Sequence, residues 1–317
     1  TAAMERWDDL TIVHRDRRVP IDGNGFAAIG RLRLLELLQG RVRDAGVRLV
    51  FERRIEDAAE LADCDLVVGA DGVNSALRQR LAGALGPRVE ELTNRFVWYG
   101  TRQTFPTLTL TFRSNADGAF VAHHYRYAGD MSTFIVECDA ASFARAGLER
   151  MSDDESRAYC ERLFAPDLGG HPLISNRSLW RRFPVLTNAR WQAGNVVLIG
   201  DALRTVHFSI GSGTRLAMED AVFLARALAE SGEDVPAALA RFDAARRPVV
   251  DKLLAGAAGS YTWYEGFAAR MGLEAYDLAW DYMTRSGRMT EERLAAIAPK
   301  FVAARNAHRA TAGEGTR

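Results

Sequence analysis

The most informative part of the hydrophobic pattern runs from Gly194 to Ala221. Val196 to Ile199 is a short, continuous apolar run, as expected for a buried parallel strand. It stops at Gly200-Asp201, a polar loop follows, and Gly211-Ser212-Gly213 opens a stretch whose apolar residues have helical spacing. A strand, an acidic residue at its carboxyl end and glycines at the start of a helix together predict a ligand site at a sheet edge.

A second strand–turn–helix unit lies earlier in the chain. Leu66 to Val68 is a buried-strand pattern, Asp71 lies in the turn after it, and helical periodicity follows at Leu77 and Leu81. Two such units predict an α/β fold with a parallel sheet. Before them, the apolar spacing predicts a loop over 22–29, a helix from Arg31 that ends at Gly46, and short strands over 11–14 and 47–51.

The pattern changes to strands between Phe96 and Glu137. Four β-rich segments predict an antiparallel sheet with one covered and one solvated face. Alternation puts His123 and Tyr125 on one face and His124 on the other. His123 and Tyr125 are therefore candidates for the wall of a binding pocket, with a purely structural histidine as the alternative. Adjacent histidines that point apart predict no metal site.

Helical patterns follow the sheet. Ser152 and Glu155 form a capping-box pattern before a helix over 153–164, and a helix over 235–255 is expected to break near Pro248. The stretch 261–303 is helical and rich in aromatic residues, which favours core or dimer packing, so a homodimer stays an option. Residues 304–317 are predicted to be a frayed tail.

Composition narrows the class of protein. Of 317 residues, 48% are hydrophobic and 26% charged, as in ordinary globular proteins, and Lys+Arg and Asp+Glu are both 41. A net charge of zero argues against nucleic acid as a partner. The separated Cys64, Cys138 and Cys160 predict buried free thiols rather than a zinc site or disulfides. With no signal-peptide pattern and no apolar run near the ~18 residues of a membrane helix, we expect a cytoplasmic protein without a membrane partner.

The stretch described first also carries a family resemblance. Gly200-Asp201-Ala202-Leu203-Arg204, with Phe208, Gly211-Ser212-Gly213 and Glu219-Asp220-Ala221, resembles the second FAD-binding motif of the class A, para-hydroxybenzoate hydroxylase-like flavoprotein hydroxylases. Arg204 stands where His is usual, and Phe208 where Pro is usual. Gly69 to Ser75, with Arg78, resembles the family's D-G fingerprint. His207 to Thr214 resembles the branch that hydroxylates aromatic acyl-CoA thioesters.

The resemblance implies an architecture. It is a Rossmann-like, three-layer FAD-binding domain with an inserted antiparallel-sheet substrate domain and a carboxyl-terminal helical segment. The expected divisions are 1–93 and 186–257 for the FAD-binding domain, 94–185 for the substrate domain, and 258–317 for the helices and tail. The family's first βαβ unit with its G-x-G-x-x-G, about 60–80 residues, is expected to be missing from the amino end, because Gly23-Asn24-Gly25 lacks the spacing.

The resemblance also implies roles for individual residues. Asp201 would hold a ribose or ribityl hydroxyl of FAD, and Asp71 would shape the entry of isoalloxazine and nicotinamide. Arg31 would contact the pyrophosphate or ribityl chain, with a solvated surface arginine as the alternative. His207, a candidate catalytic residue, and Phe208 would face the substrate ring, with a structural role as the alternative for His207. The residues expected beside the flavin pyrimidine edge are Gly211, Ser212, Gly213 and Thr214.

The implied activity is hydroxylation of an aromatic ring by FAD, NADH or NADPH, and O₂, through a flavin C4a-hydroperoxide. The expected substrate is a small aromatic molecule, in particular an aryl-CoA thioester such as salicyloyl-CoA. Three alternatives stay open. One is a hydroxylase of another aromatic, tryptophan-derived or carrier-tethered. The second is a truncated, non-catalytic remnant that lacks the first glycine motif. The third is a flavin oxidoreductase that inserts no oxygen.

Overall fold

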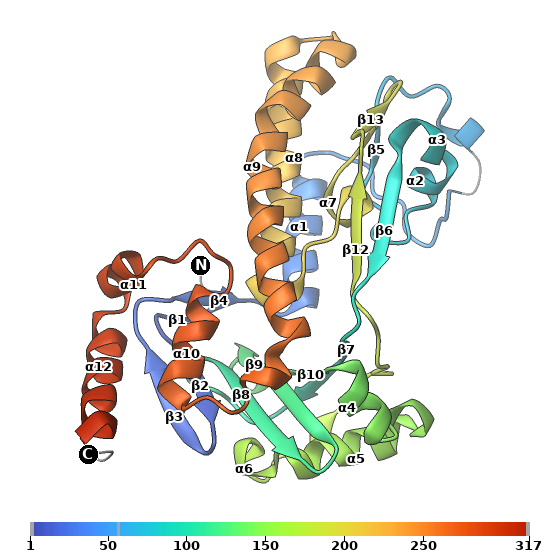
Figure 1. The fold of residues 1–317 in the computed structure, drawn as a ribbon. Coiled ribbons are helices and arrows are strands. Elements are labelled where there is room, and N and C mark those ends of the chain that lie inside the picture. The colour runs from blue at the N-terminus through green and yellow to red at the C-terminus, as the bar shows by residue number, and fades with distance from the viewer. Residues whose placement is uncertain (1–2, 56–57, 315–317) are drawn as a thin grey trace. The chain divides into compact units, whose positions relative to one another are not determined.

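The computed structural model describes residues 3–55 and 58–314 and divides into two compact units (Figure 1). The first unit comprises residues 1–49, 93–182 and 263–317, and the second comprises residues 50–92 and 183–262. Helices and parallel and antiparallel strands all occur, so the α/β fold class is confirmed. The division into cofactor and substrate domains given above stays a prediction.

A seven-stranded sheet forms the centre of the first unit. Its strand order is β11-β7-β10-β9-β8-β2-β3, and β2 pairs in parallel with β8 while the other neighbours are antiparallel. A separate two-stranded sheet joins β1 to β4, and β4 lies inside the stretch predicted to be a loop. The strands are β1 (Glu5–Trp7), β2 (Leu10–His14), β3 (Arg17–Ile21), β4 (Phe26–Ala28), β7 (Arg95–Thr101), β8 (Leu108–Asn115), β9 (Gly118–Ala128), β10 (Met131–Cys138) and β11 (Leu173–Ile174).

Both faces of the large sheet are covered, so the prediction of one solvated face is wrong. One core contains Leu110 and Val121 with aromatic residues of the carboxyl-terminal segment such as Trp263. The other contains Phe120 and Phe134 with residues that follow the sheet. The reason is that helices cover both sides, which strand alternation alone cannot reveal. The covering elements are α4 (Ala140–Arg145), η2 (Leu148–Arg150), α5 (Asp153–Leu163), α6 (Ala165–Leu168), η4 (Phe267–Arg270) and α10 (Ala275–Thr284).

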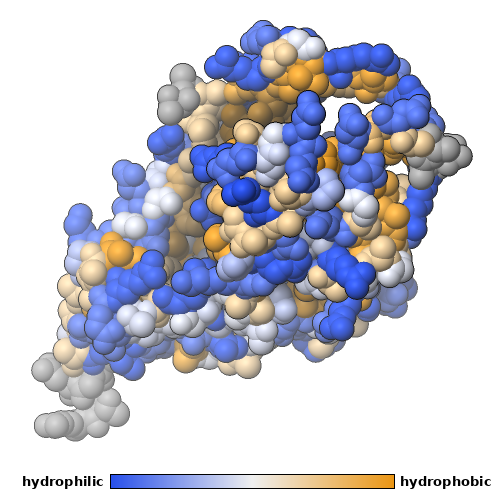
Figure 2. Space-filling model, turned by 90° about the horizontal axis from the view of Figure 1, so that it is seen from above, coloured by the Kyte–Doolittle hydropathy of each residue, from blue (hydrophilic) through white to orange (hydrophobic). Residues whose placement is uncertain are grey.

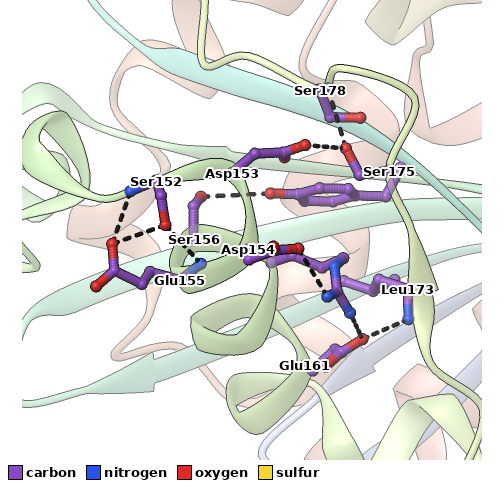
Figure 3. A network of polar contacts seen from close by, with 11 residues as sticks. Ser152, Asp153, Asp154, Glu155, Ser156, Glu161, Leu173, Ser175 and Ser178 are labelled. Carbon is purple, nitrogen blue, oxygen red and sulfur yellow. Dashed lines mark hydrogen bonds and ion pairs between the residues drawn. The ribbon is translucent and has the colours of Figure 1, made fainter.

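Polar contacts fix α5 against the strands (Figure 3). The predicted capping box is present: Ser152 accepts from the Glu155 N–H, and the Glu155 carboxylate accepts from the Ser152 N–H at 2.8 Å. Glu161 accepts the backbone N–H of Leu173 in β11 at 2.8 Å, and Arg157 donates to the Glu161 carboxylate at 3.1 Å. These bonds satisfy the exposed start of the helix and tie its other end to the sheet edge.

The carboxyl-terminal residues are ordered helix rather than a frayed tail. α11 (Glu291–Ile297) and α12 (Pro299–Glu314) continue almost to the end, and only residues 315–317 of the predicted tail lie outside the described residues. Arg305 explains why α12 holds: it pairs with Asp277 at 3.1 Å and stacks over the Trp280 ring at 4.0 Å. The aromatic stretch therefore packs as core, as predicted.

The helix predicted from Arg31 is confirmed as α1 (Arg31–Asp44), and Gly46, with φ of +72°, follows its end. The strand predicted over 47–51 is wrong. Val47, Val50 and Phe51 are more than half exposed, and no described strand pairs with this segment. A short apolar run forms a strand only where a neighbour supplies backbone partners.

A small mixed sheet of three strands forms the centre of the second unit. β14 (Val196–Leu198) lies between β5 (Val67–Gly69) and β13 (Gln192–Ala193), parallel to β5 and antiparallel to β13. A two-stranded ribbon pairs β6 (Pro87–Glu91) with β12 (Pro184–Asn188). The helices of this unit are η1 (Ala58–Leu61), α2 (Ala76–Arg80), α3 (Ala82–Leu85), α7 (Gly200–Leu203), η3 (Phe208–Ile210), α8 (Gly213–Ser231) and most of α9 (Val235–Glu265).

The predicted break of the long helix near Pro248 is wrong, because α9 passes through this proline. Phe242 on one side of it and Val250 on the other are both 0% exposed in the same hydrophobic core. Burial on both sides offsets the loss of one backbone hydrogen bond at the proline.

Hydrophobic residues form separate patches among hydrophilic ones on the face shown in Figure 2. Cys138 and Cys160 are buried as predicted, whereas Cys64 is exposed, which corrects that part of the prediction. Within residues 3–55 and 58–314, no helix combines the length and apolar character that a membrane crossing requires.

His124 supplies a pH-dependent prediction. Its Nε2 lies 2.9 Å from the Thr111 hydroxyl, its ring stacks on Phe134, and burial lowers its pKa well below the ordinary value. In the unfolded chain the His124 imidazole binds a proton as the pH falls through about 6.5, whereas in the folded chain it stays neutral. The free energy of unfolding therefore decreases as the pH falls. We expect His124→Gln to reduce the loss of unfolding free energy between pH 7.5 and 5.5 by about 1 kcal/mol. Urea unfolding at both values measures this.

The exposed His171 offers the control. His171→Gln should leave the acid-side slope of the wild type unchanged. An unchanged slope in His124→Gln as well would contradict the assignment of a neutral, buried His124.

Candidate cofactor site

The parallel pairing of β5 with β14 brings the two predicted motifs to one sheet edge. Val67 pairs with Val196 and Gly69 with Leu198, and the Ile199 N–H donates to the Gly69 carbonyl at 3.0 Å. The turns after Gly69 and after Ile199 therefore leave the sheet side by side. This edge, at the carboxyl ends of parallel strands, is where α/β proteins bind nucleotides.

Two glycines permit close packing at this edge. A Cβ on Gly69 would lie 2.5 Å from Leu198 Cδ2, so no larger residue fits without a shift. Gly200 has φ of +58°, and a Cβ there would lie 3.2 Å from the Ala217 Cβ. The first turn of α7 thus lies directly against α8 because position 200 has no side chain.

Asp71 shapes the first turn. Its Oδ2 accepts the N–H groups of Ala76 at 2.8 Å and Leu77 at 3.4 Å, which satisfies the start of α2. Ser75 accepts the Arg78 N–H at 3.0 Å and completes the cap. Two of the orphan donors at a helix start are thereby paired with a carboxylate, which also suits the helix dipole.

Arg78 joins the two turns. It is 6% exposed, and its guanidinium donates to the carbonyl of Val73 in the first turn and, at 2.9 Å, to the carbonyl of Ala202 in the second. One buried cation therefore sets the separation of the two motifs, which are 124 residues apart along the chain at these atoms. The sequence pattern had placed Arg78 in the first motif only.

Asp201 lies in the first turn of α7, one residue after Gly200, and is exposed. The turn is bound to α8, because the Gly200 N–H donates to the buried Asp220 of that helix at 3.0 Å. The predicted polar loop after the strand is thus a short helix at this point.

His207 and Phe208 lie in an aromatic cluster. Their rings stack at 4.3 Å, and the Phe183 ring meets His207 edge-on at 4.7 Å. His207 is 3% exposed, and its Nδ1 accepts the Ser209 N–H at 3.3 Å. Because Nδ1 accepts, the proton of the neutral ring lies on Nε2.

The predicted flavin-edge residues form the start of α8. Gly211 has φ of +59°, and the Ser212 side chain donates to the Ile210 carbonyl instead of capping the helix. Gly213 and Thr214 then open a 19-residue helix. The start of such a helix presents backbone N–H donors and a partial positive charge.

The remaining predicted residues belong to the first unit. Arg31 opens α1 and is exposed. His123 and Tyr125 lie on one face of β9, as alternation predicts, while the His124 ring lies among residues of the opposite core. His123 Nε2 lies 3.4 Å from a Glu137 carboxylate oxygen, and burial raises the pKa of Tyr125. Arg31, His123 and Tyr125 thus belong to the first unit, whereas the two cofactor turns belong to the second.

Sequence reasoning missed the partners that support these residues. Asp220, Arg204 and Arg246 form a buried ion cluster behind the second turn, and Glu137 lies beside His123. A charged residue inside an apolar helix face, as Asp220 is between Leu216 and Leu224, is the signal that could have found the cluster.

The donor set fits FAD. The second unit offers an exposed carboxylate at Asp201, where a sugar hydroxyl could donate, and a helix start at Gly213 for the electron-rich edge of a ring. Gly200 lets the turn lie close against α8, because a Cβ at this position would lie 3.2 Å from the Ala217 Cβ. Within the described residues, no group of three or more His, Cys, Asp or Glu is arranged to hold a metal ion.

Two acidic turns and a glycine-led helix at the edge of a parallel sheet define a nucleotide-cofactor domain of an α/β protein. Residues 35–257 match the family described as FAD binding domain, which covers more than half of the chain. The chain belongs to this family, and the resemblance to FAD-dependent aromatic hydroxylases is confirmed.

Three curated relatives are named monooxygenases or hydroxylases. Salicyloyl-CoA 5-hydroxylase of Streptomyces sp is 41% identical over 88% of this chain and 56% of its own length. Protodeoxyviolaceinate monooxygenase of Chromobacterium violaceum is 38% identical over 88% and 75%. 3-Hydroxy-4-methyl-anthranilyl-[aryl-carrier protein] 5-monooxygenase of Streptosporangium sibiricum is 38% identical over 91% and 77%. The chain thus spans about half of the first relative and three quarters of the others.

Solved structures agree on the fold. PqsL, a probable FAD-dependent monooxygenase from Pseudomonas aeruginosa, superposes with a TM-score of 0.62 at 22% identity, over 83% of this chain and 80% of its own. 2-Methyl-3-hydroxypyridine-5-carboxylic acid oxygenase gives 0.62 at 17% identity, over 91% and 77%. At these identities the likeness concerns the fold alone.

Arg78 gives the prediction for this site. Arg78→Met removes charge-assisted hydrogen bonds to Val73 and Ala202 and should lower the unfolding free energy by about 1.5–3 kcal/mol. Urea denaturation measures the change. Arg80→Met, two residues along the same helix and exposed, is the matched control and should cost less than about 0.5 kcal/mol. Equal, small losses in both variants would contradict a link between the turns.

Proposed function

We propose that this chain is the FAD-binding part of a monooxygenase that hydroxylates the aromatic ring of an aryl-CoA thioester such as salicyloyl-CoA. The observation that carries the proposal is the pair of acidic turns joined by Arg78 in a chain of the FAD binding domain family. The substrate class rests on the 41% identity to a salicyloyl-CoA 5-hydroxylase.

FAD is the cofactor that these residues would hold. Asp201 accepts from a ribose or ribityl hydroxyl, and backbone N–H groups over Gly211 to Thr214 donate to the pyrimidine edge of the flavin. Asp71 keeps the neighbouring turn open for the ring. Arg31, in the first unit, is proposed separately as a contact of the pyrophosphate or the ribityl chain. Bound FAD, reduced by NADH or NADPH, supplies the activation of O₂ that no side chain provides.

Phe208 of the second unit is a proposed contact of the substrate ring, and His123 and Tyr125 on one face of β9 in the first unit are proposed separately as substrate contacts. Aromatic faces bury a flat ring and exclude water from the reacting atoms. His207 is the candidate catalytic residue, because its ring lies beside Phe208 and an imidazole can hydrogen-bond to a phenol or thioester oxygen.

A second substrate class is favoured by a specific finding. One relative at 38% identity is named for an anthranilyl group on an aryl-carrier protein. A carrier-tethered aromatic thioester shares its reacting part with an aryl-CoA, so the same ring pocket would accept both, and only the handle of the thioester differs.

A substrate comparison tests the proposal. The chain, loaded with FAD and supplied with NADH or NADPH, is given salicyloyl-CoA, free salicylate or a salicyl-loaded carrier protein, and products are identified by mass. We expect the CoA thioester to gain one oxygen atom, at least about tenfold faster than free salicylate, because binding of the handle contributes to the transition state.

Other outcomes are decisive as well. Turnover of the carrier-bound ester alone would select the second substrate class. A product oxidised without a new oxygen atom would select a flavin oxidoreductase. FAD binding without any turnover of the three substrates would contradict the proposed hydroxylase.

His207 has its own prediction. In His207→Ala, loss of one hydrogen bond to the substrate should lower the ratio of hydroxylated product to oxidised NAD(P)H by about three- to tenfold. His171→Gln, exposed and in the first unit, serves as the control. Wild-type coupling in His207→Ala would give the histidine a packing role only.

A further inference from the structure

A buried ion cluster lies behind the turn that carries Asp201. Arg204 donates to Asp220 through both nitrogens of its guanidinium fork, at 2.7 and 2.9 Å, and Arg246 donates to the same carboxylate at 2.9 Å. The three side chains are 4%, 0% and 1% exposed. They come from three elements: the end of α7, the middle of α8 and the middle of α9.

The same carboxylate holds the backbone of the cofactor turn. Asp220 Oδ2, which Arg204 contacts, also accepts the Gly200 N–H at 3.0 Å. Arg246 reaches back to α8 as well, with 2.8 Å to Glu219 and 3.3 Å to the Leu216 carbonyl. The turn, α8 and α9 are therefore bound to one another through Asp220.

The buried carboxylate shows why Arg204 is needed. An isolated buried carboxylate is costly, and a bidentate guanidinium is the partner that offsets this cost best. Arg204 is the bidentate partner of Asp220, whereas Arg246 is shared between Asp220 and Glu219, and Glu219 also pairs with Arg215 at 3.7 Å. Removal of Arg204 would take the bidentate partner away from the buried carboxylate that holds Gly200.

Arg204 stands where the related motif usually has His. Imidazole offers at most one N–H in this direction and changes charge near neutral pH, whereas guanidinium gives two parallel donors and stays charged. A neighbouring pair lies on the same aromatic ring: Arg247, which faces the Trp191 ring as Arg204 does, is bound to Asp243 at 2.5 Å.

We propose that Arg204 is a positioning residue for FAD. Through Asp220 it fixes the Gly200 N–H and thereby aims the neighbouring Asp201 carboxylate at a sugar hydroxyl of the cofactor, and its permanent charge keeps this geometry independent of pH. This inference rests on the proposed function only in so far as Asp201 holds FAD.

The test uses the whole chain with Arg204→Lys, which keeps the charge, Arg204→His, which restores the usual motif, and Arg247→Lys as the matched control on the neighbouring pair. Two quantities are measured on each: the FAD dissociation constant by flavin fluorescence at pH 6.5 and 8.0, and hydrogen exchange of the Gly200 amide in the protein without FAD. A thermal melt first establishes that the variant is folded at the measuring temperature.

We expect Arg204→Lys to weaken FAD about tenfold, as for loss of one charge-assisted hydrogen bond, and to speed exchange of the Gly200 amide. Arg204→His should bind FAD more weakly at pH 8.0 than at 6.5, because the imidazole loses its charge between them. The wild type and Arg247→Lys should show neither effect. If Arg204→His does not fold, Arg204→Lys alone still decides.

Two results would overturn the inference. One is wild-type FAD affinity in a folded Arg204→Lys, even with a lowered melting temperature, since the cluster would then only stabilise the fold. The other is unchanged exchange of Gly200. A wild-type chain that binds no FAD would instead contradict the proposed function, and the Gly200 exchange would still test whether Arg204 holds the turn.

Discussion

The cofactor site depends on one register: β14 lies parallel to β5, so that Leu198 pairs with Gly69. This pairing puts the Asp71 turn and the Asp201 turn at the same edge of one sheet. A parallel pair needs a long crossover, and here more than a hundred residues, including strands β7 to β11 of the large sheet, lie between the two strands. Most of the large sheet is thus inserted in the sequence between β5 and β14, while its strands β2 and β3 precede both.

Buried cations make this arrangement specific. Arg78 of α2 donates to a backbone carbonyl in each of the two turns. Arg204 and Arg246 hold the second turn through Asp220, which accepts the Gly200 N–H. Hydrogen bonds to charged groups contribute more than neutral ones and cost more when broken. A short turn such as α7 gains from them an orientation that its four residues could not keep by themselves.

The parts of the fold that follow local periodicity could be predicted from the sequence. The individual strands β5 and β14, the helix from Arg31 and the capping box at Ser152 each follow from patterns within a few residues. The strand expected over 47–51 failed because a strand needs a partner, and the break expected at Pro248 failed because burial of Phe242 and Val250 holds the helix.

The candidate site divides in the same way. Asp71, Asp201 and Gly211 to Thr214 could be predicted from the sequence, because the glycines and acidic residues of the motifs occur at fixed spacing. In the cluster around Asp220, Arg204 lies 16 positions before the aspartate and Arg246 lies 26 positions after it, and the three residues belong to three elements. No local sequence pattern encodes such contacts.

The central claim is that these two turns hold FAD. The most direct measurement is the visible absorbance of the chain after incubation with excess FAD and gel filtration, with Asp201→Ala beside it. Flavin bands that co-elute with the wild-type chain and are reduced in Asp201→Ala would support the account. A colourless wild-type protein, or equal flavin content in the two, would contradict it.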